Sequence, residues 1–252
     1  MTFSAAGLDG PTSATVKVQV SDGSGTGEDS ATVNVVNVAP TITSVTAGPN
    51  AACGAGSSLT VVFTDPGAGE TFNATVNWGG GVVEQFTGVT SPFTPSHIYP
   101  SAGTKVVSVT ITDDDGGVSA PDADLLRVNY TVVGGGVQQP LNASGPMSVF
   151  RAGTVIPVSV QLQDCDGTFP SNLAPTLTVE LVSHDRPGAV NEANVTPKPK
   201  ADTGAYMRYD AAQMRYVYNL ATKRLSDQTA TYWLTITVPS TGQTISVLFG
   251  IR

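Results

Sequence analysis

Three consecutive aspartates, Asp113, Asp114 and Asp115, form the densest acidic cluster of the chain and stand directly before two glycines. Carboxylate oxygens are hard ligands of the kind that Ca²⁺ prefers, so this cluster could hold the ion with help from Asp65 or a backbone carbonyl. The alternative is a solvated hairpin tip whose Asp and Gly residues supply turn geometry. The sequence favours the plain turn and leaves the three aspartates as calcium candidates; no other cofactor is expected.

Two further acidic positions have turn-like surroundings. Asp22 occupies an equivalent place upstream, but Gly23 and Ser24 follow it, so a shared ion-binding rule is not indicated. The segment Asp164-Cys165-Asp166-Gly167 begins with the spacing of an EF-hand loop, yet the later ligands and the distal Glu are missing. We expect a turn there as well.

Residues suited to catalysis are few. The only histidines, His97 and His184, are far apart in the sequence, and neither a nucleophile-elbow motif nor an H-E-x-x-H motif is present. Paired carboxylates form only in three dimensions, but the chain has few glutamates from which to build an acidic cleft. We therefore predict no catalytic residues and no enzymatic activity.

Exposed aromatic side chains could bind sugars by stacking against them. Trp78 and Trp233 lie in alternating stretches, where a core position is the expected one. Tyr206, Tyr209 and Tyr216 could instead supply exposed rings, because they lie in or beside a stretch of mixed charge without clean periodicity. We interpret residues 198–210 as a long loop that leads into a strand.

The two cysteines, Cys53 and Cys165, leave two alternatives open. They fall in different predicted modules, so a disulfide would have to join modules. Otherwise both are free thiols, and neither has the neighbouring His or Cys spacing of a metal site or a thiol nucleophile.

These residues must be positioned by β-strands. Val16, Val18 and Val20 alternate with polar residues, turn residues follow at 22–25, and residues 31–36 resume as a strand, which predicts a hairpin. About 91 residues later the same order returns: alternation over 107–112, a turn at 113–117 and a strand over 125–130. The chain therefore contains an internal repeat about as long as one β-sandwich.

Further strands are predicted between and after the two hairpins, at 42–47, 58–63, 73–78, 82–86, 104–112, 154–162, 232–238 and 243–249. Pro40 marks a junction near residue 38, and a Gly- and Pro-bearing stretch at 132–146 reads as a linker. The expected architecture is all-β, with tandem immunoglobulin-like β-sandwich modules. It comprises a partial repeat at 1–37, a sandwich at 38–131, the linker and a C-terminal sandwich at 147–252.

Five segments resemble, in order, the PKD repeat of large bacterial surface proteins: Asn37-Val38-Ala39-Pro40-Thr41, Phe63-Thr64-Asp65-Pro66-Gly67, Val76-Asn77-Trp78-Gly79-Gly80-Gly81, His97-Ile98-Tyr99 and Val109-Thr110-Ile111-Thr112-Asp113-Asp114-Asp115-Gly116-Gly117. The resemblance implies an immunoglobulin-like sandwich in which His97 has a structural role beside Tyr99. One departure is Gly80, which stands where the family usually has Asp, so a turn contact or ion ligation by that Asp does not carry over.

The last 105 or so residues resemble a β-sandwich module that commonly ends secreted bacterial proteins. The segments that carry this resemblance are Val149-Phe150-Arg151-Ala152-Gly153-Thr154-Val155-Ile156-Pro157-Val158, Gln161-Leu162-Gln163-Asp164 and the strands around Tyr218-Asn219 and at 245–251. The resemblance implies the fold and no activity.

Charge narrows the possible functions. The net charge of −8 disfavours binding to nucleic acid or to anionic membrane, and no run approaches the roughly 20 apolar residues of a transmembrane helix. We expect a non-catalytic stalk or spacer of a bacterial extracellular or cell-surface protein, with adhesion or self-association through the hairpin in 1–37. The alternative is an accessory carbohydrate-binding module of a secreted hydrolase, which would bind polysaccharide.

Overall fold

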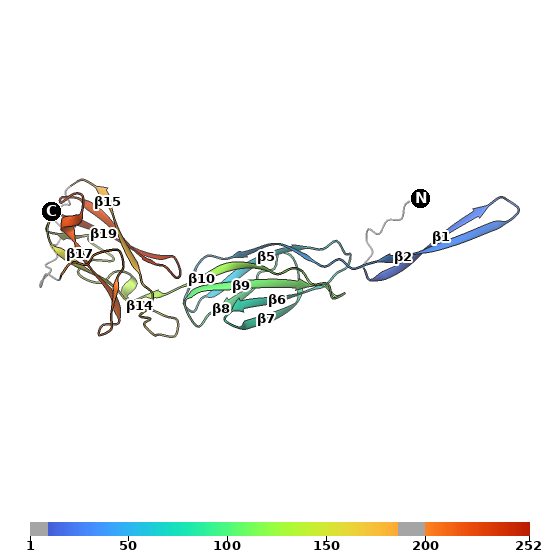
Figure 1. The fold of residues 1–252 in the computed structure, drawn as a ribbon, viewed down its shortest axis with the longest axis horizontal. Helices are drawn as coiled ribbons and strands as arrows, with labels where there is room; N and C mark the ends of the chain where they lie inside the picture. Colours follow the sequence, from blue (N-terminus) through green and yellow to red (C-terminus); the bar gives the residue numbers. More distant parts are fainter. Residues whose placement is uncertain (1–9, 186–199) are drawn as a thin grey trace. The chain divides into compact units, whose positions relative to one another are not determined.

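Strands account for nearly all regular structure in the computed structural model, which describes residues 10–185 and 200–252 (Figure 1). The helical segments in these ranges are two 3-10 turns, η1 (Val133–Gly135) and η2 (Thr222–Arg224). No described helix has the length and hydropathy needed to cross a membrane. The all-β class predicted from Val and Thr alternation is confirmed.

The chain forms two compact units. The first comprises the described parts of Met1–Pro49 with Ser57–His97 and Lys105–Leu126. The second comprises Asn50–Gly56, Ile98–Thr104 and the described parts of Arg127–Arg252. Residues 1–9 of the predicted partial repeat, and the beginning of the predicted loop at 198–210, lie outside the described residues.

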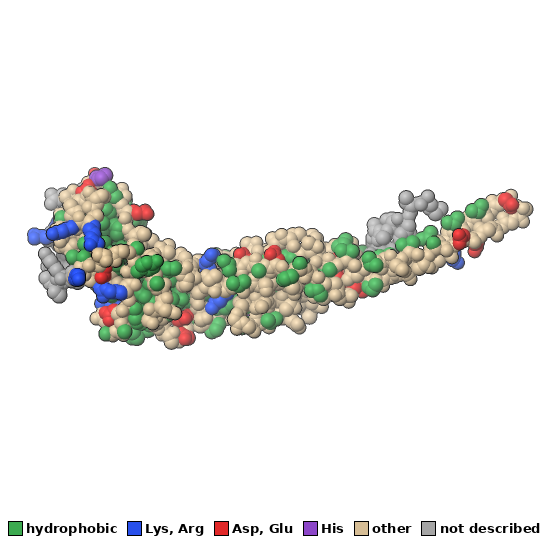
Figure 2. Space-filling model, in the orientation of Figure 1, with side chains coloured by type: hydrophobic (Ala, Val, Ile, Leu, Met, Phe, Trp, Pro, Cys, Tyr) green, Lys and Arg blue, Asp and Glu red, His purple; other side chains and the backbone are tan. Residues whose placement is uncertain are grey.

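The first hairpin has the predicted strands and turn. β1 (Thr12–Ser21) pairs antiparallel with β2 (Thr26–Val35), and these two strands make a sheet of their own. The Asp22 carboxylate accepts hydrogen bonds from the backbone N–H groups of Ser24 and Gly25, which closes the turn. Figure 2 shows hydrophobic side chains exposed along this hairpin.

Two sheets form the sandwich that follows the hairpin. One has the order β4-β10-β9-β6-β7 and the other the order β3-β5-β8. The strands of the first sheet are β4 (Ala51–Ala52), β6 (Phe72–Gly79), β7 (Val82–Val89), β9 (Gly103–Thr112) and β10 (Asp122–Asn129); those of the second are β3 (Thr41–Ala47), β5 (Gly56–Thr64) and β8 (Ser96–Ile98).

Alternation along these strands buries one side of each sheet. Val76 of β6 lies opposite Val109 of β9, and both side chains are fully buried. In the facing sheet, Val61 of β5 is buried in the same way. Trp78 has no exposed surface, as expected of a core tryptophan in an immunoglobulin-like sandwich.

The second unit has a four-stranded sheet, β12-β19-β18-β15, a three-stranded sheet, β13-β17-β16, and the short pair β11-β14. The strands of the four-stranded sheet are β12 (Ser148–Phe150), β15 (Thr176–Ser183), β18 (Thr231–Val238) and β19 (Gln243–Ile251). The others are β11 (Thr131–Val132), β13 (Val155–Val160), β14 (Leu162–Gln163), β16 (Arg208–Asp210) and β17 (Arg215–Ala221).

β12 and β19 are the first and last strands of the four-stranded sheet along the chain. They are neighbours in the sheet and run parallel. Phe150 of β12 pairs with Ile251 of β19, and Ser148 pairs with Phe249. The backbone N–H of Arg252 also donates to the carbonyl of Phe150 at 3.0 Å. The two ends of this sandwich are therefore held side by side by a parallel ladder.

The stretch 132–146 packs within the second unit. The side chains of Val137 and Leu141 are buried, and the backbone N–H of Gln138 donates to the carbonyl of Ser159 at 2.9 Å. This Gly- and Pro-bearing stretch is therefore part of the folded second unit. The module borders near residues 38, 132 and 147 stay predictions.

Candidate functional site

Asp113 lies at the end of β9 and its side chain is buried, with 2% exposed. Its carboxylate accepts a hydrogen bond from the backbone N–H of Gly117 at 2.6 Å and another from Asn37 Nδ2 at 2.9 Å. The first bond closes the turn, and the second fixes the segment that follows β2. Asp113 therefore has a structural use in holding this turn.

Asp114 points to a different partner. Its Oδ1 accepts a hydrogen bond from the backbone N–H of Thr71 at 3.0 Å, and this bond is the main reason why the pKa of Asp114 lies below its ordinary value. Asp22 shows the same effect, since the N–H of Ser24 lowers its pKa. Both turns use carboxylates as acceptors for backbone donors.

The three aspartates do not bring their ligand atoms together. Among the described residues, the set of three His, Cys, Asp or Glu side chains with all ligand atoms within 4.8 Å of one another is Cys53, Asp164 and Cys165. The carboxylates of Asp113 and Asp114 instead bond to separate N–H groups. Calcium binding at Asp113, Asp114 and Asp115 stays an untested prediction.

Cys53 and Cys165 form a disulfide across 112 positions of the sequence. Of the two alternatives, free thiols are wrong, and the bonded sulfurs are not available as thiolate ligands. Next to the bond, Asp164 Oδ1 accepts hydrogen bonds from the N–H groups of Cys165 at 2.7 Å and Ala102 at 2.6 Å. This acidic side chain organises the loops around the disulfide.

The segment from Asp164 to Gly167 is a turn, as predicted. The N–H of Gly167 donates to the carbonyl of Asp164 at 3.0 Å. Asp166 Oδ1 accepts hydrogen bonds from both the N–H and the hydroxyl of Thr168, which lowers the pKa of Asp166. The Asp166 carboxylate therefore serves local turn geometry, while Asp164 also binds the distant N–H of Ala102.

Each histidine pairs with one carboxylate within its own unit. His97 Nδ1 lies 2.9 Å from Glu84 Oε1, and its ring stacks on Trp78 with centroids 5.3 Å apart. His184 Nδ1 lies 2.8 Å from Asp227 Oδ2, and this contact is the main cause of the lowered pKa of Asp227. His97 thus contributes to packing against the core tryptophan.

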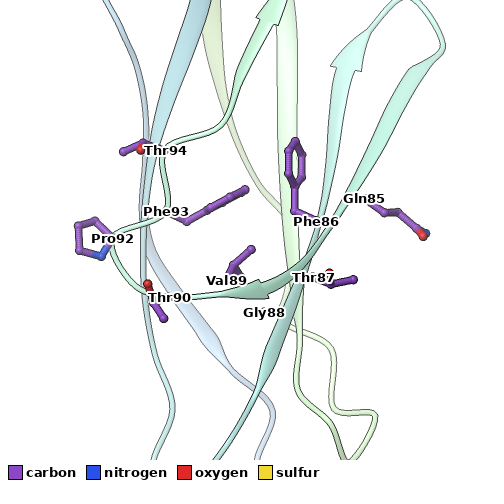
Figure 3. Close-up of a pocket in the computed structure, with 9 residues that line it drawn as sticks. All are labelled: Gln85, Phe86, Thr87, Gly88, Val89, Thr90, Pro92, Phe93 and Thr94. Carbon is purple, nitrogen blue, oxygen red and sulfur yellow. The ribbon is translucent and has the colours of Figure 1, made fainter.

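A depression of about 620 Å³ opens beside β7 and the segment after it (Figure 3). Phe86 and Phe93 face each other there, with ring centroids 5.1 Å apart in an edge-on arrangement, while Gln85 and Pro92 point away. The residues that line it are Gln85, Phe86, Thr87, Gly88, Val89, Thr90, Pro92, Phe93 and Thr94. This lining has no titratable side chain, so it offers no acid or base.

The three tyrosines do not form one platform. Tyr216 is 2% exposed, and its hydroxyl accepts from the N–H of Leu173 and donates to the carbonyl of Pro170. Tyr209 packs edge-on against the Tyr216 ring, whereas Tyr206 is 69% exposed. The proposal of a shared exposed surface is wrong for Tyr216, because its ring belongs to the core.

The prediction that Trp233 lies in the core is wrong. Its side chain is 41% exposed, although it lies in an alternating strand and was expected in the core. Tyr232 and Leu234, its neighbours in β18, take the buried positions. Period-2 alternation identifies two faces of a strand but does not say which one receives the tryptophan.

Comparisons with known proteins give no family. No protein-family model matches the chain, and no curated protein matches it.

Similar solved structures include a PKD domain of an M14-like peptidase from a Thermoplasmatales archaeon, with 26% identity and a TM-score of 0.31 over 37% of this chain and 98% of that one. Fibronectin(III)-like modules of Clostridium thermocellum CbhA are 14% identical, with a TM-score of 0.30 over 84% of this chain and 94% of that one. The ICAM-5 D1–D4 ectodomain fragment is 13% identical, with a TM-score of 0.37 over 95% of this chain and 60% of that one. At TM-scores this low, the fold assignment rests on the sheets described above.

Proposed function

We propose that this chain is a load-bearing spacer of an extracellular or cell-surface protein and has no catalytic role. The observation that carries the proposal is the parallel pairing of β12 with β19, which are the first and last strands of the four-stranded sheet along the chain. These strands lead to the two ends of the C-terminal sandwich. Because β12 lies between Cys53 and Cys165 in the sequence, the disulfide carries tension past residues 54–164 in the oxidised protein, and tension acts on the ladder once the disulfide is reduced.

The direction of the hydrogen bonds explains why this pairing suits a spacer. The bonds of a parallel pair are slanted and evenly spaced between the strands, so a force that pulls β12 and β19 in opposite directions along their length shears all the bonds together. Bonds loaded together resist more force than bonds opened one by one. The N–H of Ala152, which donates to the carbonyl of Arg252, extends the ladder beyond the paired strands.

The disulfide supports an extracellular location. Disulfides persist in oxidising compartments and are rare in the cytosol of most organisms. Cys53 and Cys165 also join loop Asn50–Gly56 to the turn after β14 within the second unit, where the loop backbone is further held by β4 pairing parallel with β10. Such a link limits how far tension can open the unit.

Single-molecule pulling from the two ends of the chain tests the load-bearing role. We expect a discrete unfolding event for the C-terminal sandwich in the reduced protein, in which tension reaches the ladder between β12 and β19. Reduction should add contour length equal to the 112-residue separation of the cysteines, roughly 370 Å, and this gain provides an internal control that the molecule is attached by its ends. Smooth extension of the C-terminal sandwich at low force would contradict the proposal.

A second candidate function is carbohydrate binding, as in an accessory module of a secreted hydrolase. The observation that favours it is the Trp233 ring, which is 41% exposed and lines a cavity of about 230 Å³ together with polar side chains, a combination typical of small-molecule sites. Of the three tyrosines predicted for this role, Tyr216 is excluded because its ring is buried.

A further inference from the structure

Trp233 lies on the outward face of the four-stranded sheet. In β18 its side chain points away from the core, on the same side as Thr235 and Thr237. Glu180 of β15 is directly opposite it on one side, and Leu248 of β19 on the other. Opposed residues in antiparallel strands have Cβ atoms about 5 Å apart, so the ring is flanked by a carboxylate and an aliphatic side chain.

Hydroxyl groups cover the next two rows of this face. Thr178, Thr235 and Ser246 make one row across the three strands, and the hydroxyls of Thr235 and Ser246 lie 3.0 Å apart. The next row consists of Thr176, Thr237 and Thr244. Tyr206, which is 69% exposed, pairs with Thr176 at the edge of this row. The outward face thus combines two exposed aromatic rings, Trp233 and Tyr206, with rows of hydrogen-bonding groups.

A cavity of about 230 Å³ adjoins the ring. Trp233, Ser246 and Leu248 line one part of it, and Asn142, Ser144 and Met147 line another. The wall from the 142–147 segment is pre-organised, because Asn142 donates from Nδ2 to the carbonyl of Pro146 and from its backbone N–H to the Ser148 hydroxyl. Little ordering is then needed when a ligand binds.

We infer that this face binds a neutral saccharide, with a sugar ring against Trp233. The apolar C–H face of a sugar matches an aromatic ring, and sugar hydroxyls can both donate to Glu180 and exchange hydrogen bonds with the threonine and serine rows. Small-molecule sites commonly combine an aromatic surface with a few placed polar groups in this way.

Charge and polarity separate this ligand from other classes. The residues of the three rows and of the cavity include one acid and no Lys or Arg, which disfavours phosphate, sulfate or uronate groups. The many hydroxyls are also unlike the apolar core of a protein–protein interface. The inference gives the second candidate function a ligand and a site, and it does not depend on the spacer role.

A binding screen of the whole chain against immobilised polysaccharides tests the inference. We expect binding to at least one neutral polymer among cellulose, xylan, mannan and chitin, and none to pectin or heparin. Trp233→Ala should weaken binding at least about thirtyfold, the loss expected from removing a central Trp anchor. Glu180→Gln should weaken it less, because an amide oxygen still accepts a hydrogen bond.

Met214→Ala is the matched control, because it removes another exposed large apolar side chain from the same unit, in the turn between β16 and β17 of the three-stranded sheet. It should bind as the wild type does, and the thermal midpoint of each variant should match that of the wild type. Fluorescence gives a direct readout, since Trp78 is fully buried and a bound sugar should shield only Trp233 from a quencher. A silent screen, binding only to the anionic polymers, or unchanged binding by Trp233→Ala would each overturn the inference.

Discussion

The Tyr216 hydroxyl shows how a buried polar group is made compatible with a core. It accepts from the N–H of Leu173 at 2.8 Å and donates to the carbonyl of Pro170 at 2.9 Å, and burial raises its pKa above 10.0. The hydroxyl therefore stays protonated over the physiological range, as its donor role requires. Two backbone groups of the segment before β15 depend on one side chain.

Tyr216→Phe should lower the free energy of unfolding by about 1–3 kcal/mol, because it leaves a buried donor and a buried acceptor without a partner. Urea denaturation would measure the change. Tyr206→Phe provides the control, since Tyr206 is mostly exposed and its hydroxyl remains replaceable by water. Equal midpoints for Tyr216→Phe and the wild type would show that water satisfies both backbone groups.

Asp114 makes the fold sensitive to acid in a defined direction. The N–H of Thr71 favours the ionised carboxylate, so the folded pKa lies below the ordinary value of 3.8. A lowered folded pKa contributes stability that is present above the unfolded pKa and is lost as pH falls through the folded pKa. The contribution should therefore be complete near neutral pH, begin to fall as the pH approaches 3.8, and be lost once the pH is below the folded pKa.

NMR titration of the Asp114 carboxyl should give a midpoint below 3.8, and Thr71→Pro, which removes the donating N–H, should raise it. Asp22 gives a comparison within the same unit, because its lowered pKa comes mainly from the N–H of Ser24 and should not respond to Thr71→Pro. A midpoint for Asp114 unaffected by Thr71→Pro would assign the low pKa to another donor.

The hairpin of β1 and β2 has one mainly apolar face. Register and alternation place Ala14, Val16, Val18, Val20, Ala31, Val33 and Val35 there, together with Thr12 and with Asp29, which lies opposite Val18. Val18 and Val20 are 46% and 67% exposed. A two-stranded sheet with an uncovered apolar face is marginal in water and tends to pack against another β-surface.

We expect the protein to self-associate through this face, with apparent mass rising with concentration in analytical ultracentrifugation. Val18→Thr combined with Val20→Thr keeps β-branched side chains but reduces the apolar surface, and should shift the distribution towards monomer. Lys17→Thr with Gln19→Thr alters the opposite face and serves as the control. Self-association that is equal in both double variants would place the contact elsewhere.

Some strands were predictable and others were not. The strand pattern of the hairpin and of β6, β9, β18 and β19 follows from strict alternation between valine-rich and polar positions. β15 was not predicted, although Leu177, Val179 and Leu181 alternate with polar residues; the structure shows this stretch paired with β18 in the four-stranded sheet. β12 is three residues long and fully buried, so it shows no alternation.

The disulfide constrains the whole molecule more than any single contact. It closes a 112-residue separation, and restricting so long a segment of the unfolded chain is expected to be worth about 2–5 kcal/mol. Urea unfolding with and without reductant should show this loss. Cys53→Ser combined with Cys165→Ser should match the reduced wild type and no longer respond to reductant; a response in the double variant would assign the effect to something other than this bond.

The chain's own sequence determined the class of the fold. Valine alternation, Asp-Gly turns and the repeat of about 91 residues are local features, and local geometry is enough to predict strands, hairpins and the buried Trp78. The same local chemistry identified Asp22, Asp113 and Asp164 as turn residues, since each accepts hydrogen bonds from N–H groups within a few positions.

Only the tertiary structure decided which distant groups meet. The partner of Cys53, the parallel ladder between β12 and β19 and the burial of Tyr216 depend on segments far apart in the sequence, which no local period encodes. The exposure of Trp233 is of the same kind, because alternation gives a strand two faces and the packing of the other sheet selects the one that is buried. The sugar-binding face proposed here could be recognised only after that selection was known.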